Sequence, residues 1–178
     1  MRPSIMIKEW AGIAMLAVGL CAVSITGCKK SPERIAEMTN LLFDAISKND
    51  TEQAKLAISG GANLKVTRFD DGVTPLIYAI QKNRDAIVEL LIKSKVDLNA
   101  TDIGNVEWTP IYWAVYTREG LGNSHKTHER NINIVKMLID AGADLNVRDS
   151  NGSTALQRAT RRGYKDIVEL LKAAGASE

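Results

Sequence analysis

The sequence predicts an all-α fold, a solenoid of about four stacked helix pairs, and three observations support this prediction. A short signature recurs as "TPLIYA" from Thr74, "TPIYWA" from Thr109 and "TALQRA" from Thr154. Each signature is followed by an apolar helical segment, "DAIVELLI", "NINIVKMLI" or "KDIVELL". A polar stretch then closes the unit, as in "VDLNATD" from Val96 and "ADLNVRD" from Ala143. Such self-similarity indicates a repeat protein, in which each unit buries its apolar face against its neighbours.

A degenerate unit precedes these three and begins the predicted stack. It contains "LLFDAISKND", "EQAKLAISGG" and "ANLKV". Ser31 is expected to cap its first helix, and Pro32 fits the first turn because that turn needs no backbone N–H donor. An apolar stripe at helical spacing follows, formed by Ile35, Met38, Leu42, Ala45 and Ile46. This helix is expected to shield the end of the stack from solvent.

The three later units begin and end on the same physical signals. The threonine of each signature caps free N–H groups of a first turn, and the alanine that ends each signature lets the paired helices approach closely. Gly61 and Gly142 suit the left-handed turn that ends the second helix of the first and third units. Lys95 takes this place in the second unit, where a less favourable turn is expected.

These units resemble the ankyrin repeat, whose period is about 33 residues and whose signature is Thr-Pro-Leu-His-x-Ala. The resemblance covers nearly all of residues 35–178 and implies helix pairs joined by short β-hairpin tips. The signature histidine is replaced by Ile77, Tyr112 and Gln157, so a local side-chain hydrogen bond is expected to be lost. Successive signatures lie 35 and then 45 residues apart, which places insertions at "DIGNVEW" and at residues 120–130. The second insertion is either a tolerated loop or a partner contact.

Residues 1–27 are interpreted as a secretory signal peptide. Arg2 and Lys8 precede an apolar run that ends at residue 25, and this run is shorter than the about 20 residues that a membrane-spanning helix needs. Its ending, "ITGC", resembles the lipobox of bacterial lipoproteins. The resemblance implies cleavage after Gly27, a diacylglyceryl thioether on Cys28 and acylation of the freed amine, typically with palmitate. A buried helix or an uncleaved anchor is the other interpretation.

The expected organisation is a signal peptide at 1–27, a lipidated cysteine and tether at 28–32, and the repeat domain at 33–178. Two lysines follow the cysteine in place of the aspartate that commonly retains lipoproteins in the inner membrane. The resemblance therefore implies anchoring at the periplasmic face of the outer membrane. Translation from Met38 would add a minor cytosolic form that keeps every repeat, although an ordinary core methionine is the other interpretation.

Composition and motifs exclude several function classes. The formal net charge is only +2, and no basic tract is interleaved with aromatic residues, so nucleic acid is not an expected partner. His125, His128 and Glu129 could approach a metal on a helix, but they lack a further ligand and a packed second shell. No Gly-x-Ser-x-Gly motif and no phosphate-binding loop is present. We therefore expect no enzyme activity, no cofactor and no metal.

A protein-binding role has positive support. In ankyrin repeats partners dock on the hairpin tips and on outer positions of each first helix. Carried over residue by residue, this gives a predicted site of Phe69, Ile103, Trp108, Tyr116, Arg161 and Arg162. Aromatic residues and arginine tend to dominate interface energetics. Phe69 and Ile103 could instead fold back onto the hairpins, whereas Trp108 is expected to be exposed and outside the core.

The combined resemblance gives a specific expectation about function. Small ankyrin lipoproteins resemble immunity proteins that are paired with phospholipase effectors of type VI secretion systems. The expected function is a membrane-tethered immunity protein, monomeric or in a 1:1 heterodimer, that sterically blocks such a toxin in the periplasm. The alternative is an envelope scaffold or an accessory factor for an endogenous periplasmic enzyme.

Overall fold

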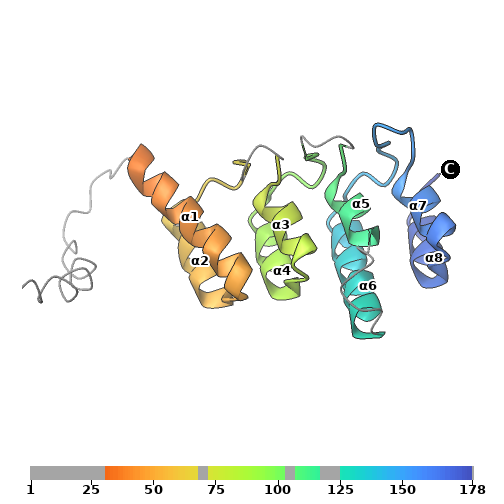
Figure 1. The fold of residues 1–178 in the computed structure, drawn as a ribbon, viewed down its shortest axis with the longest axis horizontal. Coiled ribbons are helices and arrows are strands. Elements are labelled where there is room, and N and C mark those ends of the chain that lie inside the picture. The colour runs from red at the N-terminus through yellow and green to blue at the C-terminus, as the bar shows by residue number, and fades with distance from the viewer. Residues whose placement is uncertain (1–30, 68–71, 103–106, 117–124, 178) are drawn as a thin grey trace, which may run out of the picture. The chain divides into compact units, whose positions relative to one another are not determined.

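The repeat region folds as a row of helix pairs. The computed structural model describes residues 31–67, 72–102, 107–116 and 125–177, except for the side chains of 125–131. Residues Ser31–Glu178 form one compact unit. Its helices are α1 (Pro32–Lys48), α2 (Thr51–Gly60), α3 (Pro75–Gln81), α4 (Asp85–Lys93), α5 (Pro110–Val115), α6 (His125–Asp140), α7 (Ala155–Arg162) and α8 (Lys165–Ala173). Figure 1 shows the pairs α1–α2, α3–α4, α5–α6 and α7–α8 side by side, and the expected solenoid of helix pairs is confirmed.

The first helix of each pair starts on the hydroxyl cap that its sequence predicts. The cap oxygen accepts a hydrogen bond from the N–H three residues later, at 3.3 to 3.4 Å, at Ser31, Thr74, Thr109 and Thr154. At the last cap the Gln157 side chain also accepts from the backbone N–H of Thr154 at 3.1 Å, which completes a capping box. The expected loss of a local hydrogen bond is therefore wrong at Gln157, because its amide replaces the histidine as acceptor.

The helix ends follow the predicted difference between glycine and lysine. Gly61 has φ 96° and Gly142 has φ 84°, both in the left-handed region that glycine adopts without strain. Lys95 has φ 57° at the equivalent place after α4 and still donates its backbone N–H to Ile92 at 2.9 Å. The less favourable turn that the sequence predicts at Lys95 is confirmed.

The described residues contain no strand, although Val73 in the first tip is an isolated β-bridge residue. Asp102 donates its backbone N–H to the Trp108 carbonyl at 3.3 Å, and Asp149 donates its own to the Ser153 carbonyl at 3.0 Å. In a β-ladder the backbone N–H groups of Trp108 and Ser153 would donate back to the aspartate carbonyls. Here they donate instead to the carboxylates of Asp102 and Asp149, at 2.8 Å in both tips. The aspartate side chains thus accept a hydrogen bond that a β-ladder would form between backbone groups. The β-hairpins that the resemblance implies are therefore turns in these two tips.

One hydrophobic core runs through the row from α1 to α8. In α1, Leu42, Ala45 and Ile46 are fully buried as predicted, and Phe43 joins them. Ile35 and Met38 are only partly buried. The reason is length, since α1 has 17 residues and α2 only 10, and the first turns of α1 have little to pack against.

Polar side chains connect neighbouring repeats at specific points. Arg84 precedes α4 and donates from Nε to the Ile46 carbonyl at 3.1 Å and from Nη2 to the Ser47 carbonyl at 3.0 Å. These two carbonyls belong to the last turns of α1, where the Ile46 carbonyl also accepts from the Asn49 N–H at 3.3 Å. Further along, the Asn99 side chain accepts from the Asp144 N–H at 2.9 Å, one repeat away. Similar bonds run from Ser177 to Asn146.

Candidate protein-binding surface

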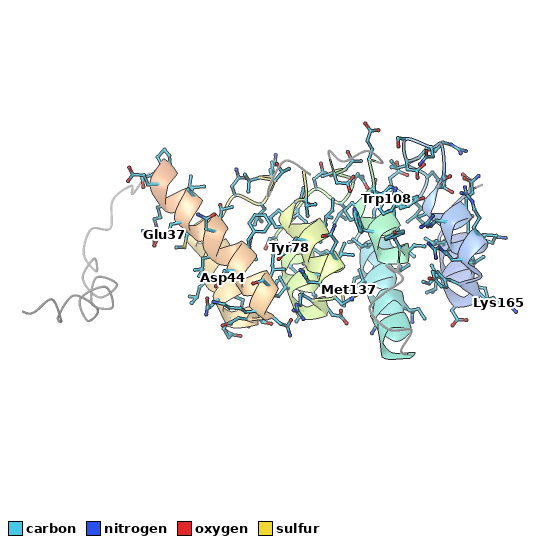
Figure 2. All side chains as sticks on the ribbon, in the orientation of Figure 1. Glu37, Asp44, Tyr78, Trp108, Met137 and Lys165 are labelled. Atoms are coloured by element: carbon cyan, nitrogen blue, oxygen red, sulfur yellow. The ribbon has the colours of Figure 1, made fainter. Side chains whose placement is uncertain are left out.

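Four aromatic side chains gather around α5 and form what we call the aromatic cluster: Trp108, Tyr112, Trp113 and Tyr116. The Trp108 ring centroid lies 5.0 Å from that of Tyr112, 4.8 Å from that of Trp113 and 4.4 Å from that of Tyr116. Figure 2 labels Trp108 beside α5. Such tilted and offset ring pairs each add stability beyond the area that they bury.

Asp102 orients the two tryptophans of the cluster. Its carboxylate is buried and accepts from the Trp108 backbone N–H at 2.8 Å and from the Trp113 indole N–H at 3.1 Å. The Trp108 ring is itself half-buried and packs against the core, and its indole N–H is buried with no acceptor at hydrogen-bond distance among the described residues. The prediction that Trp108 is exposed and outside the core is therefore wrong, because neighbouring rings cover it.

Tyr112 links the cluster to the next tip. Burial raises the pKa of Tyr112 to about 12, and a hydrogen bond from its hydroxyl to Asp149 acts in the same direction. Burial also tends to raise the pKa of Asp149, but N–H donors from Ser153 and Asn151 and the Tyr112 hydroxyl outweigh it, so this pKa lies below its usual range. The Trp108 indole also lowers the pKa of Asp149. Tyr112 thus replaces the signature histidine with a bond to the following repeat.

Cationic side chains lie over the aromatic rings. The Arg158 guanidinium carbon of α7 lies 4.8 Å from the Tyr116 ring centroid and 5.9 Å from that of Trp108. In α3, Lys82 Nζ lies 5.4 Å from the centroid of Tyr78, which Figure 2 labels. Both arrangements have cation–π geometry.

The structure brings some of the predicted site residues together. Trp108 and Tyr116 are in ring contact, and Arg161 is exposed and donates to the Ser153 hydroxyl at 2.6 Å. Arg162 is half-buried in the last turn of α7. Phe69 and Ile103 lie outside the described residues, as does Cys28 with the signal segment 1–27. Of the 120–130 insertion, residues 120–124 also lie outside, whereas the backbone of 125–130 begins α6. Their roles stay predictions.

Sequence reasoning missed three residues of this surface. Tyr78, Trp113 and Arg158 each precede the alanine that ends a signature, and all three are half-exposed. Their repeat position was identifiable from the sequence, but the prediction used only the positions after the alanine. Lys82 lies one helical turn after Tyr78, a spacing that the sequence shows. The contacts of Trp113 with Asp102 and of Arg158 with Tyr116 come from other segments, and no local pattern indicates them.

Two further findings concern metal and membrane. The described part of the chain contains no group of three His, Cys, Asp or Glu side chains placed to hold a metal ion, and the side chains of His125 and His128 lie outside it. None of the described helices has the length and apolar character needed to cross a membrane.

Comparison with known proteins gives a consistent pattern. Family models described as ankyrin repeats match residues 21–102, 42–125 and 126–171. The chain is 37% identical over 113 residues to the ankyrin repeat protein YahD of Escherichia coli K12, covering 62% of the chain and 50% of that protein. It is 30% identical to ankyrin repeat and SOCS box protein 6 of mouse, covering 68% of the chain but 26% of the relative. It is also 32% identical to the glycerophosphocholine phosphodiesterase GDE1 of Candida albicans, covering 74% of the chain but only 10% of that protein.

Proposed function

Because the chain belongs to the ankyrin-repeat family, we propose that it is a protein-binding module held at a bacterial membrane by a lipid on Cys28. The observation that carries the binding role is the aromatic cluster, with Arg158 stacked on it and Arg161 exposed beside it. Aromatic rings and guanidinium groups at a partly exposed surface are the residues that most often anchor protein partners.

The lipid anchor is supported by sequence alone. An apolar segment of secretory length ends in "ITGC" at Cys28, which resembles a lipobox. One acyl chain holds a protein to a membrane only marginally, whereas several hold it firmly. The outer-membrane periplasmic face is the expected location, because two lysines follow the cysteine.

The most specific form of the proposal is toxin immunity by steric blocking. A stack of helix pairs offers a large preformed surface, so little conformational entropy is lost on docking. A lipid anchor would place this surface where a secreted phospholipase attacks its substrate. The match to a phosphodiesterase covers only 10% of that enzyme, and we propose no enzyme activity, cofactor or metal for this chain.

The lipid anchor is tested by metabolic labelling. Cys28→Ser should leave an unprocessed precursor that takes up no radioactive palmitate, while Cys21→Ser, its matched control within the signal segment, should be labelled like the natural protein. Equal palmitate labelling of Cys28→Ser would exclude lipidation at this residue.

The binding role is tested with the full-length tagged protein, cross-linked in cells and purified from membranes. A toxin-blocking role predicts that the captured protein is a phospholipase and that adding the repeat protein lowers its rate of lipid hydrolysis. A captured envelope enzyme whose activity is unchanged or higher would support the scaffold alternative. Capture of no protein would contradict both.

A further inference from the structure

Two of the second helices, α2 and α4, each contain an internal ion pair. Lys55 of α2 lies 2.6 Å from Glu52, and Lys93 of α4 lies 2.6 Å from Glu89. Each pair joins residues one helical turn apart on an exposed surface. A lysine charge is therefore balanced locally in both of these helices.

The first-helix face combines cations with aromatic rings. We use this name for the surface residues of α3, α5 and α7, namely Tyr78, Lys82, Trp113, Tyr116, Arg158 and Arg161. In the part of the chain that the structure describes, no carboxylate oxygen lies within 4.0 Å of a side-chain nitrogen of Lys82, Arg158 or Arg161. These three cations come from two different repeats, so the face is positive over more than one unit.

Two carboxylates at the tips beside α5 and α7 face inward. Asp102 is 6% exposed and holds Trp108 and Trp113, and Asp149 is 7% exposed and holds the turn before α7. Both side chains are already occupied by donors from their own tips or from α5. Among the described residues, neither aspartate forms an ion pair with Arg158 or Arg161.

The geometry of Arg158 favours a carboxylate as the missing partner. Its guanidinium lies over the Tyr116 ring, and its Nε is buried without an acceptor among the described residues. A guanidinium stacked on a ring can still donate from its two terminal Nη groups, and these match the two oxygens of a carboxylate. The stacking also holds the group in place before a partner arrives, which lowers the entropy lost on binding.

We propose that the first-helix face binds an acidic segment of the partner protein. Its Asp or Glu side chains pair with Arg158 and Arg161, and its apolar side chains lie on the rings of Trp113 and Tyr116. Anionic lipid carries the same charge, but Arg158 is half-buried, and a carboxylate on a flexible side chain reaches it more easily than a flat membrane does. This inference rests on the proposed binding function and specifies the partner's chemistry.

The test uses the full-length lipidated protein in its bacterial cells with a photoreactive phenylalanine analogue at Gln81. This residue occupies the repeat position of Tyr116 and Arg161 and is half-exposed in α3. The control is the same analogue at Glu169 on the exposed side of α8. We expect a cross-link at position 81 to a protein segment that contains several Asp or Glu residues, and no such cross-link at 169.

Arginine variants then test the pairing. Arg158→Gln with Arg161→Gln should reduce the cross-linked product at least tenfold. The matched control, Lys165→Gln with Lys172→Gln, removes the same charge from α8 of the same repeat and should leave the yield unchanged. Thermal melts check that both double variants remain folded.

The outcomes separate this inference from the proposed function. A protein cross-linked at position 81 that lacks acidic residues at the cross-linked segment, or whose yield does not depend on the arginines, overturns the inference and leaves the binding function standing. A cross-link to phospholipid that the arginine variants abolish assigns the face to anionic lipid instead. A protein cross-linked only at position 169 places the binding surface on the second helices. No protein cross-link at either position contradicts the binding function itself.

Discussion

Lys95 adopts a backbone conformation that a residue with a side chain disfavours. Its φ of 57° lies in the left-handed region, which costs a residue with a Cβ about 1 to 2 kcal/mol. Lys95→Gly removes this strain but adds freedom to the unfolded chain, so we expect the free energy of unfolding to rise by about 0.5 to 1 kcal/mol. Urea unfolding followed by circular dichroism measures the change.

The matched control is Gly142→Ala at the equivalent turn after α6. A Cβ there meets no atom within 4 Å, so only the backbone preference is affected. At φ 84° this variant should lower the free energy of unfolding by about 1 kcal/mol. A Lys95→Gly variant that is no more stable than the natural protein would show that the turn after α4 is not strained.

Tyr112 makes a prediction at high pH. Burial and the bond to Asp149 raise its pKa from 10.0 to about 12. The folded state therefore holds this proton more tightly than the unfolded state, and the resulting stability is complete below about pH 10 and is lost as the pH rises toward about 12. Ultraviolet titration of tyrosinate should show one late phase, absent in Tyr112→Phe and present in Tyr164→Phe. A late phase that survives in Tyr112→Phe would contradict this assignment.

Trp108 stabilises the packing around α5 and is also a predicted binding residue. Because the ring contacts three aromatic side chains and Arg158, we expect Trp108→Ala to lower the free energy of unfolding by about 2 to 3 kcal/mol. Trp108→Phe keeps part of the packing and should lose less. Chemical denaturation of both variants checks this. An unchanged urea midpoint for Trp108→Ala would mean that the cluster contributes nothing to stability.

At the scale of single elements, helix boundaries were predictable and tip packing was not. The helices that follow Thr74, Thr109 and Thr154 start where the threonine hydroxyl accepts from the N–H three residues later. Because this contact is local, the sequence alone indicates where each helix begins. The environment of Trp108 depends on Asp102 six residues before it and on Arg158 one repeat later. The site prediction found part of the surface by repeat equivalence but could not anticipate contacts across repeats.

Arg84 links the second helix pair to the first, and its substitution measures how much this link stabilises the first pair. Its two hydrogen bonds supply donors to the end of α1, and hydrogen bonds to charged groups contribute about 1.5 to 3 kcal/mol. Arg84→Ala should therefore speed amide hydrogen exchange in α1 and α2 more than in α7 and α8. Arg34→Ala, which removes an exposed arginine from α1, is the control. Equal exchange in all four helices would place the stabilising effect of Arg84 elsewhere.

At the scale of the whole molecule, Met38 is a predicted second start of translation that would give a shorter protein product. Met38 lies in α1 against Gly60, where an added Cβ would come within 2.6 Å of its sulfur, so it also has an ordinary packing role. A chain started there lacks the first turns of α1 but keeps the buried Leu42, Ala45 and Ile46. Met38→Leu keeps side-chain volume and should remove a smaller cytosolic product on immunoblots, while Met137→Leu should not. Persistence of that product would exclude initiation at Met38.

The row of pairs in Figure 1 has a mechanical consequence. Each first helix packs against the first helices of adjacent repeats, and each second helix packs against the second helices. The interfaces between repeats therefore follow one another in a row, like elastic elements in series. A small displacement at each interface adds to the next, and compliance therefore grows with the number of repeats. If α3 to α7 are clamped by a bound protein, the stiffening reaches α1 and α2 through a single interface. The first pair contacts the clamped repeats through α3 and α4, so it can still move relative to them.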